Sequence, residues 1–345
     1  MKLSAVDLSP VPRDGTAADA FENTVETARQ AEELGFERVW VAEHHGRAER
    51  LAGVSPEVLL GHLAAETEEI RIGSGAVLLN HYQPYKVAEE FGVLDGLAPG
   101  RVDAGLGRAN GSPAVDRALG TSRRVENPDE DHKEKIRAVL AHLHDDFPES
   151  HPYADLAVPR SDADAPVPWV LGSSTGSATI AGELGLRFCF AAFIRPDVAT
   201  RAFDTYREAF AESEADLPGG IDEPQGIVTV NAVCAETDHE AARQRAVAEA
   251  TFRRIQRGHS GPTPTVEEAI AELGGVPEPT PETLDEGEWP RAISGSPETL
   301  AGLLDQLADR VDVDEVMIQH ATADHETALR SHELLADGVG LSPET

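Results

Sequence analysis

The stretch AEELGFERVW at residues 31–40 has a counterpart in AGELGLRFCF at residues 181–190. In both stretches a segment with helical spacing of apolar residues ends at Leu-Gly, and a short apolar strand follows at once. Gly35 is placed to stop the first of these helices, which the apolar spacing puts at residues 18–34. The repeated order of helix, glycine and strand predicts an α/β protein.

Short apolar runs and helical periods continue to alternate along the chain on both sides of these stretches. They predict further helices at residues 84–97 and 238–257, and another that begins after Ser55. Eight alternations in 345 residues imply parallel strands with crossover helices, and they fit a closed (β/α)8 TIM barrel better than an open sheet. The predicted strands are 2–8, 38–43, 70–79, 101–106, 168–171, 187–191, 227–233 and 313–319.

Two stretches interrupt this alternation. Residues 144–167 are rich in Pro, Asp and Ala, and we expect a long loop there. Residues 258–293 are rich in proline and carry more turn signals than a helix tolerates. In a barrel both would be loop insertions at the carboxyl-terminal face, and the second is a candidate lid or subunit contact. The composition never shifts as it would in a linker, so we predict one domain over residues 1–345.

The chain is strongly acidic. It has 62 Asp and Glu residues against 29 Lys and Arg residues, a formal net charge of −33 and a pI of about 4.6. The acidic residues are spread along the chain, and only four of the basic residues are lysines. Such a surface is typical of proteins from halophiles, in which salt screens self-repulsion; an acidic mesophilic protein is the alternative. Nucleic-acid phosphate would be repelled, so we expect no nucleic-acid partner.

The apolar segments and the cysteines bear on location. No apolar run approaches the roughly 18 residues of a membrane span, and the chain opens without a secretory apolar segment. Cys189 and Cys234 are the only cysteines, and each lies in an apolar run, so neither a disulfide framework nor a cysteine metal site is expected. We therefore expect a cytoplasmic protein with no membrane partner and no bound metal.

In a barrel the working residues lie at the carboxyl ends of the strands. Glu43, His44 and His45 directly follow the apolar run at 39–42. Imidazoles, with an ordinary pKa near 6.5, are suited to acid–base or hydrogen-bonding work. Adjacent side chains of an extended chain point to opposite faces, so at most one imidazole should face a group from another strand. A structural histidine pair packed beneath a loop is the alternative.

A glycine- and serine-rich turn follows the predicted strand 168–171. Residues 172–177 read GSSTGS and open a helix. Gly172, Ser173, Ser174 and Ser177 would offer free backbone N–H groups, hydroxyls and the positive end of a helix dipole, which together favour a phosphate site. The common nucleotide patterns GxGxxG and GxxxxGK[ST] are absent at this turn. Ordinary serine capping is the alternative.

Two further strand ends are candidates. Arg108 follows the predicted strand 101–106 and is one of few cations near this face, so it suits a phosphate or a cofactor carbonyl. Its alternative is a salt bridge to one of the many carboxylates. Residues 73–76 read GSGA, and their glycines would let a flat ligand lie against the strand. A tight barrel turn would explain them equally well.

Taken in their order along the chain, these candidate segments resemble those of the bacterial luciferase-like family of flavin-dependent monooxygenases. The chain is more similar to single-subunit luciferase-like oxidoreductases than to the light-emitting enzymes. Its segment 258–293 is short and Pro-rich and does not match the mobile loop of the light-emitting enzymes, so bioluminescence is not expected. The segments that carry the resemblance are LSPV at 8–11, ELGFERVWVAEHH at 33–45, PEVLLGHLAAET at 56–67, IRIGSGAVLL at 70–79, FGVLDGLAPGRVDAGLGRA at 91–109, WVLGSSTGSATIAGELGL at 169–186 and SGSPETLAGLL at 294–304.

The resemblance implies a set of roles for the candidate residues. Glu43 and His44 would line the isoalloxazine pocket, with His44 and His45 as the catalytic residues near the meeting point of reduced flavin and O2. Gly75–Ala76 matches a place where the family often has a non-proline cis peptide under the flavin ring. The phosphate would be held by Arg108, Gly172, Ser173, Ser174 and Ser177.

It also implies partners and a reaction. A separate flavin reductase would deliver reduced FMN, and O2 would then oxidise a small organic substrate. The alternatives are a coenzyme F420-dependent oxidoreductase on the same fold and a flavin-binding protein without catalysis. We expect a homodimer.

Overall fold

The computed structural model describes residues 1–109, 112–120, 125–213, 217–259 and 261–341. Its strands are β1 (Lys2–Asp7), β2 (Arg38–Val41), β3 (Arg71–Ser74), β4 (Val77–Leu78), β5 (Val102–Gly107), β6 (Val167–Gly172), β7 (Arg187–Ala191), β8 (Gly226–Cys234), β9 (Ala292–Gly295) and β10 (Glu315–Gln319). Its helices are α1 (Ala17–Glu33), α2 (Pro56–Glu66), α3 (Pro84–Leu97), α4 (Pro113–Ala118), α5 (Pro128–His144), α6 (Thr175–Glu183), α7 (Ala199–Phe210), α8 (Asp238–Gln256), α9 (Val266–Leu273), α10 (Pro297–Val311) and α11 (His325–Val339), with 3-10 turns η1 (Leu79–His81) and η2 (Pro196–Val198).

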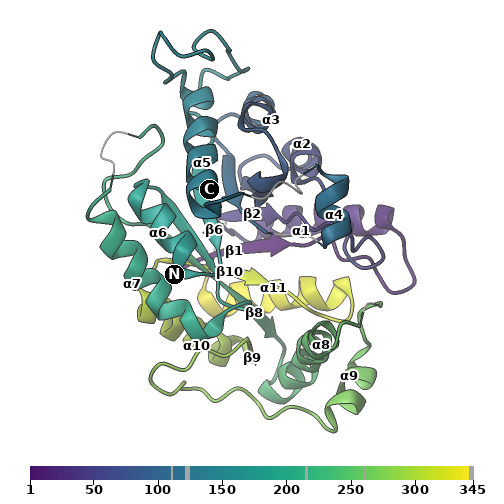
Figure 1. The fold of residues 1–345 in the computed structure, drawn as a ribbon. Helices are drawn as coiled ribbons and strands as arrows, with labels where there is room; N and C mark the ends of the chain where they lie inside the picture. Colours follow the sequence, from purple (N-terminus) through teal and green to yellow (C-terminus); the bar gives the residue numbers. More distant parts are fainter. Residues whose placement is uncertain (110–111, 121–124, 214–216, 260, 342–345) are drawn as a thin grey trace.

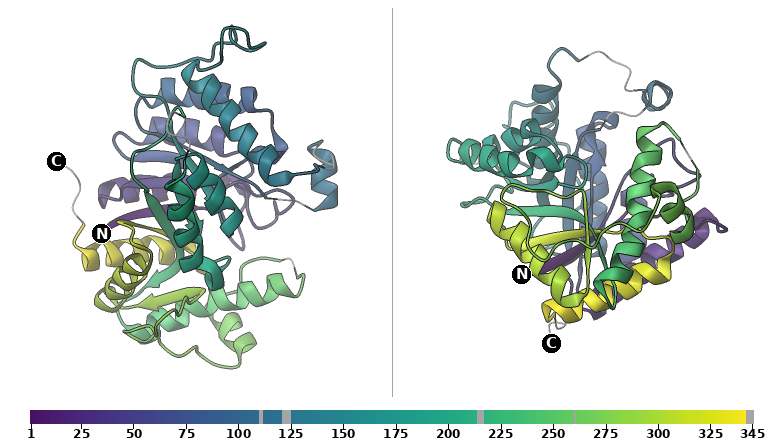
Figure 2. Two further views of the ribbon diagram at one scale, coloured as in Figure 1. Left: turned by 60° about the vertical axis from the view of Figure 1, so that its left-hand side comes forward. Right: turned by 90° about the horizontal axis from the view of Figure 1, so that it is seen from below.

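Eight parallel strands close into a barrel with helices around it (Figures 1 and 2). The ring runs β1, β2, β3, β5, β6, β7, β8 and β10, and it closes because β10 pairs with both β1 and β8. Every strand pair in the barrel is parallel, as crossover helices require. The predicted TIM barrel is confirmed.

Two predicted elements need correction. The strand expected at 70–79 is two pieces, β3 and β4, because the pairing is interrupted at Gly75–Ala76. The stretch 258–293 was expected to hold no helix, yet it contains α9 and begins β9, which pairs with β8 outside the barrel. Thr265 and Glu268 form a capping box at the start of α9, and Gly274 ends it, so the prolines of this stretch flank the helix. The long loop before β6 is confirmed at residues 145–166.

Successive side chains of a barrel strand pack into two different apolar layers, one inside the barrel and one between the barrel and the helices. On β2, Val39 and Val41 pack outward against the helices, whereas Trp40 points into the barrel and meets Trp169 of β6 edge to face at 5.6 Å. The free thiols of Cys189 and Cys234 are both buried. None of the described helices combines the length and the hydropathy that a membrane crossing needs.

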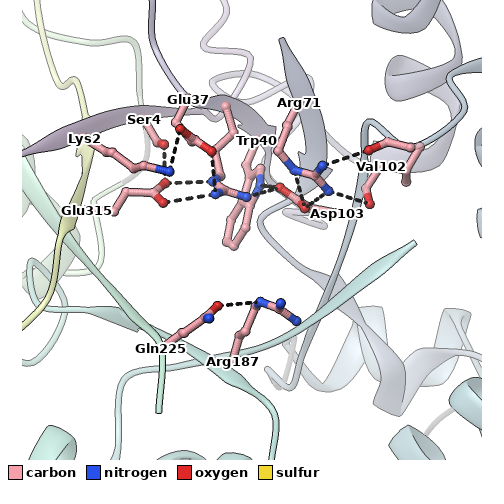
Figure 3. A network of polar contacts seen from close by, with 12 residues as sticks. Lys2, Ser4, Glu37, Trp40, Arg71, Val102, Asp103, Arg187, Gln225 and Glu315 are labelled. Carbon is pink, nitrogen blue, oxygen red and sulfur yellow. Dashed lines mark hydrogen bonds and ion pairs between the residues drawn. The ribbon is translucent and has the colours of Figure 1, made fainter. Parts of the chain in front are cut away.

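A buried ion network fills the amino-terminal end of the barrel. Arg38 on β2 pairs with Glu315 on β10 at 2.7 Å and with Asp103 on β5 at 2.6 Å. Asp103 also accepts hydrogen bonds from Trp40 and Arg71, as Figure 3 shows. Each buried charge therefore has an opposite partner, which offsets the cost of desolvation. Buried side chains therefore fill this end of the barrel.

Candidate functional site

A cavity of about 870 Å³ opens at the carboxyl-terminal end of the barrel. Leu8, Asn231 and Gln319 line it from the strand side, and the Asn231 amide donates to Gln319 Oε1 at 2.7 Å. Helix α8 and residues 278–292 supply other lining groups, among them Phe252. The Pro-rich insertion after α8 therefore forms part of the wall of this cavity.

His44 lies at the end of β2 and lines the cavity. Its backbone N–H donates to the Gly53 carbonyl at 2.8 Å, which fixes the chain at this point. Burial, together with the positive charges of Arg47 and Arg50, lowers the pKa of His44 to about 4. Its Nδ1 atom is buried and has no hydrogen-bond partner among the described residues. His44 is thus an uncharged imidazole in the cavity wall, with one buried ring nitrogen that lacks a hydrogen-bond partner among the described residues.

Glu43 and His45 lie outside the lining of the cavity and bind each other. The Nε2 atom of His45 lies 2.5 Å from Glu43 Oε1, and the Tyr82 hydroxyl donates to the same oxygen at 2.8 Å. The other Glu43 oxygen accepts from the backbone N–H of Leu78 at 2.8 Å. Burial raises the pKa of Glu43, against the opposing effect of these hydrogen bonds. Glu43 therefore joins the end of β2 to β4 and orients His45, while His44 alone of the two imidazoles reaches the cavity.

The Gly75–Ala76 peptide is cis, as the resemblance implied. The Gly75 N–H donates to the Val41 carbonyl at 2.8 Å, which ties the turn to β2. A Cβ atom on Gly107 of β5 would lie 2.8 Å from the Cβ of Ala76. Glycine at position 107 therefore allows the close approach of these two chain segments.

The turn between β6 and α6 forms a capping box. Ser174 Oγ accepts from the Ser177 N–H at 3.2 Å, and the Ser177 hydroxyl donates to the Ser174 carbonyl at 2.8 Å. A Cβ atom on Gly172 would lie only 2.0 Å from Ser177 Oγ, so glycine alone fits there. In this structure the two serine hydroxyls therefore cap the helix, which is the alternative to a phosphate site. Ser174 itself is exposed, and the turn from Gly172 through Ser173 leaves the start of the helix open to solvent.

Arg108 follows β5 and pairs with Asp129 at 2.5 Å. Asp129 belongs to the first turn of α5, and its Oδ2 atom lies 3.8 Å from where a Cβ on Gly176 would be. The structure thus brings Arg108 and the start of α6 together, with a carboxylate between them. Sequence reasoning missed Asp129, for which the only signal was an acidic helix start after Pro128.

Three further cavity residues were not predicted from the sequence: Arg47, Arg50 and Asn231; Gln319, which also lines the cavity, ends a predicted strand. The signal for the two arginines was their position, because GRAER at 46–50 directly follows the EHH segment at the end of β2. Asn231 and Gln319 are polar residues within apolar strands, and they are opposite each other in the β8–β10 register.

Comparison with known proteins places this geometry in a family. The model of the family described as luciferase-like monooxygenase matches residues 1–313. The N-acetyl-S-alkylcysteine monooxygenase of Bacillus subtilis is 35% identical over 345 residues, which cover 98% of each chain. The solved structure of apo-MsnO8 is 38% identical, with a TM-score of 0.86 and 99% of each chain covered.

More distant structures share the fold alone. They include the FMN-bound oxygenating constituent of 3,6-diketocamphane monooxygenase from Pseudomonas putida, at 21% identity and a TM-score of 0.71 over 98% of each chain. An F420-dependent secondary alcohol dehydrogenase has 16% identity and a TM-score of 0.67, again over 98% of each chain. Both flavin and deazaflavin enzymes thus use this barrel. From the family match and its near full-length relatives, the chain belongs to the luciferase-like monooxygenases.

Proposed function

We propose that this protein is an FMN-dependent monooxygenase. Reduced FMN and O2 would oxidise an organic substrate, with one oxygen atom entering the product and the other leaving as water. The observation that carries the proposal is His44, an uncharged imidazole that lines the cavity at the carboxyl end of the barrel and whose buried Nδ1 has no hydrogen-bond partner in the described part of the chain. Family membership and the monooxygenase relative at 35% identity support the reaction class.

The residues present fit FMN. A phosphate would be held at the start of α6 by the backbone of the Gly172 turn and by the hydroxyls of Ser174 and Ser177, with Arg108 beside them. The flavin ring would lie towards His44, whose free Nδ1 needs a polar partner. When bound, reduced FMN supplies two electrons for the reduction of O2.

The chain's own residues would control protons and water. His44 is uncharged at neutral pH, so it can hold a proton at one ring nitrogen and accept one at the other as negative charge develops in the cavity. Phe193, Phe252 and Leu284 give the cavity apolar surface, which disfavours water near the reacting atoms. Glu43 and His45 do not line the cavity, and they would act as positioning residues that hold the end of β2.

Reduced flavin would come from a separate flavin reductase, and we propose that the enzyme works as a cytoplasmic homodimer. The alternatives are an F420-dependent enzyme that transfers hydride without oxygen, and a flavin-binding protein without catalysis. The distant F420-dependent relative shares the fold, so the fold does not distinguish these three functions. A measurement of cofactor binding is needed to distinguish them.

The test is to titrate the protein with FMN, with reduced FMN under anaerobic conditions and with F420, followed by stopped-flow mixing with O2. We expect tight binding of reduced FMN, negligible binding of F420, and an oxidation rate of reduced FMN that changes when it is bound. Tight F420 binding together with unchanged oxidation of reduced FMN would replace the oxygenase with the hydride-transfer enzyme. Flavin binding with unchanged oxidation would favour the non-catalytic protein.

A further inference from the structure

Two arginines in the loop after β2 line the cavity and have no counter-ion in the part of the chain that the structure describes. Arg47 and Arg50 line it beside His44. Among the residues that the structure describes, neither guanidinium makes an ion pair or a side-chain hydrogen bond. The sequence contains 62 carboxylates, so acidic partners are plentiful elsewhere on the chain. Arg50 is partly buried, and burial and the nearby charge of Arg47 lower its pKa. Two close cations of this kind favour an external anion.

Two of the other arginines that line the cavity are already engaged, whereas Arg253, exposed on α8, makes no ion pair among the described residues. Arg245 pairs with Glu249 at 3.0 Å and donates to the Glu278 carbonyl at 2.6 Å. Arg291 donates to the carbonyls of residues 193 and 194 and stacks on the Phe252 ring at 3.8 Å. These two arginines build the wall of the cavity. Arg47 and Arg50 make no such contacts, so their positive charge remains available to a ligand.

The rest of the cavity surface is largely apolar. Leu51 follows the arginine pair in sequence, and Phe193, Ile194, Phe252 and Ile255 also line the cavity. Ile194 and Ile255 are 48% and 40% exposed, so both present apolar surface that a ligand can cover. A ligand that covers them would need an apolar part, and one that also meets the arginines would need a negative group.

We propose that the substrate is an organic carboxylate, held through its carboxylate group by Arg47 and Arg50 and through an apolar arm by the wall of Phe193, Ile194 and Phe252. The inference rests on the proposed function and names the substrate class of the same cavity. The guanidinium fork matches the planar carboxylate and can bind it with two parallel hydrogen bonds. The protein would also bind a second anion, the phosphate of FMN. The start of α6 and Arg108 offer a separate site for this phosphate.

The test compares straight-chain acids from hexanoate to dodecanoate with their primary amides, which have the same shape without the charge. Binding is measured by calorimetry on the protein, both free and loaded with oxidised FMN. We expect at least one acid to bind ten-fold or more tightly than its amide. The R47Q/R50Q variant should lose this preference, and R47K/R50K should retain part of it. The matched control is R201Q, which removes an exposed arginine of α7 outside the cavity lining.

FMN and riboflavin binding on the same variants separates the two proposals. We expect R47Q/R50Q to bind both as the unaltered protein does. If the variant weakens FMN but spares riboflavin, the pair holds the cofactor phosphate, and the inference is overturned while the proposed function stands. If no acid in the series is preferred over its amide, the inference is equally overturned. Failure of the unaltered protein to bind any flavin would count against the proposed function, and the acid–amide comparison on the free protein would still decide the substrate class.

Discussion

His44 and His45 are adjacent in the segment that follows β2, yet they have different surroundings. His45 binds the buried Glu43 carboxylate at 2.5 Å, whereas His44 has its unpartnered Nδ1 and faces the cavity. The alternation of side chains along an extended chain predicts this separation. It does not predict which of the two imidazoles faces the cavity. That depends on Leu78 and Tyr82, which bind Glu43 and so fix the carboxylate that holds His45.

Replacing His44 tests its role in proton control. We expect His44→Ala to reduce product formation in a reductase-coupled assay by about 10²–10⁴-fold, the range typical of positioned acid–base groups. Reduced FMN should still bind, since the proposed phosphate site lies elsewhere. His62→Ala is the control, because its side chain is 56% exposed on α2 and lies outside the cavity lining. Product formation within a few-fold of the unaltered protein would exclude a proton role for His44.

Asp129 was not predictable, because its position beside α6 arises only when α5 packs in the folded barrel. Its carboxylate holds Arg108 where we place the FMN phosphate, so the two negative groups would compete. We expect Asp129→Asn to tighten FMN binding and to leave riboflavin binding unchanged, as measured by fluorescence titration. Asp131→Asn, two residues along the same helix, is the control. Weaker FMN binding in Asp129→Asn would show that the carboxylate orients Arg108 for the phosphate instead of competing with it.

At the scale of elements, the long strands and helices were predictable because each buries a periodic apolar face. The helix predicted at 84–97 coincides with α3, and the strand at 187–191 with β7. Long helices such as α5 were expected only from the general alternation, without bounds, and the elements that the alternation did not imply are short. β4 has two residues and β9 has four, too few for a period to appear, and α9 is an eight-residue helix between prolines. The positions of candidate residues at strand ends followed from the barrel, whereas their partners depended on loop packing.

The start of α6 carries the prediction for the cofactor phosphate. Ser174→Ala with Ser177→Ala should weaken FMN far more than riboflavin, because only FMN presents a phosphate to the helix. Each lost charge-assisted hydrogen bond should cost about 1.5–3 kcal/mol of binding free energy. Since the two serines also cap α6, the variant should lose about 1 kcal/mol of folding stability.

Thr237→Ala is the matched control for this cap effect. Thr237 caps α8 through the Glu240 N–H, so its loss should lower stability by a similar amount without changing the FMN-to-riboflavin ratio. If the serine variant weakened FMN and riboflavin equally, the two hydroxyls would serve only as caps, and the phosphate site would have to be sought elsewhere.

For the whole molecule, buried uncharged imidazoles predict a loss of stability in acid. Burial lowers the pKa of His44, His132 and His320 to about 4, and that of His332 well below its usual value. The unfolded chain, with ordinary histidine pKa values near 6.5, binds protons between pH 6.5 and 4 that the folded chain does not. This contribution to stability is therefore complete above about pH 6.5 and declines as the pH falls towards 4.

The measurement is urea unfolding between pH 7.5 and 5 in 2 M KCl, where salt screens the change in net charge. Removing one buried imidazole by His132→Gln should make the pH slope shallower, by up to about 1.4 kcal/mol per pH unit. His62→Gln, at an exposed site, should leave the slope as it is. An unchanged slope in His132→Gln would mean that His132 is charged in the folded protein.

The net charge of −33 dominates the surface as a whole, so the stability of the protein should depend on salt. Salt weakens both the repulsion among like charges and the attraction within exposed ion pairs such as Arg13–Glu268 and Arg330–Glu236. Exposed pairs contribute only about 0–1 kcal/mol each, while repulsion acts among all the excess carboxylates. Because the Debye length falls from about 10 Å at 0.1 M to about 3 Å at 1 M, we expect the melting temperature to rise with KCl into the molar range. NaCl at equal concentration should give a similar rise, because screening depends on ionic strength. A melting temperature that stays flat or falls from 0.1 to 2 M KCl would mean that the acidic surface is not an adaptation to salt, and it would favour the acidic mesophilic protein.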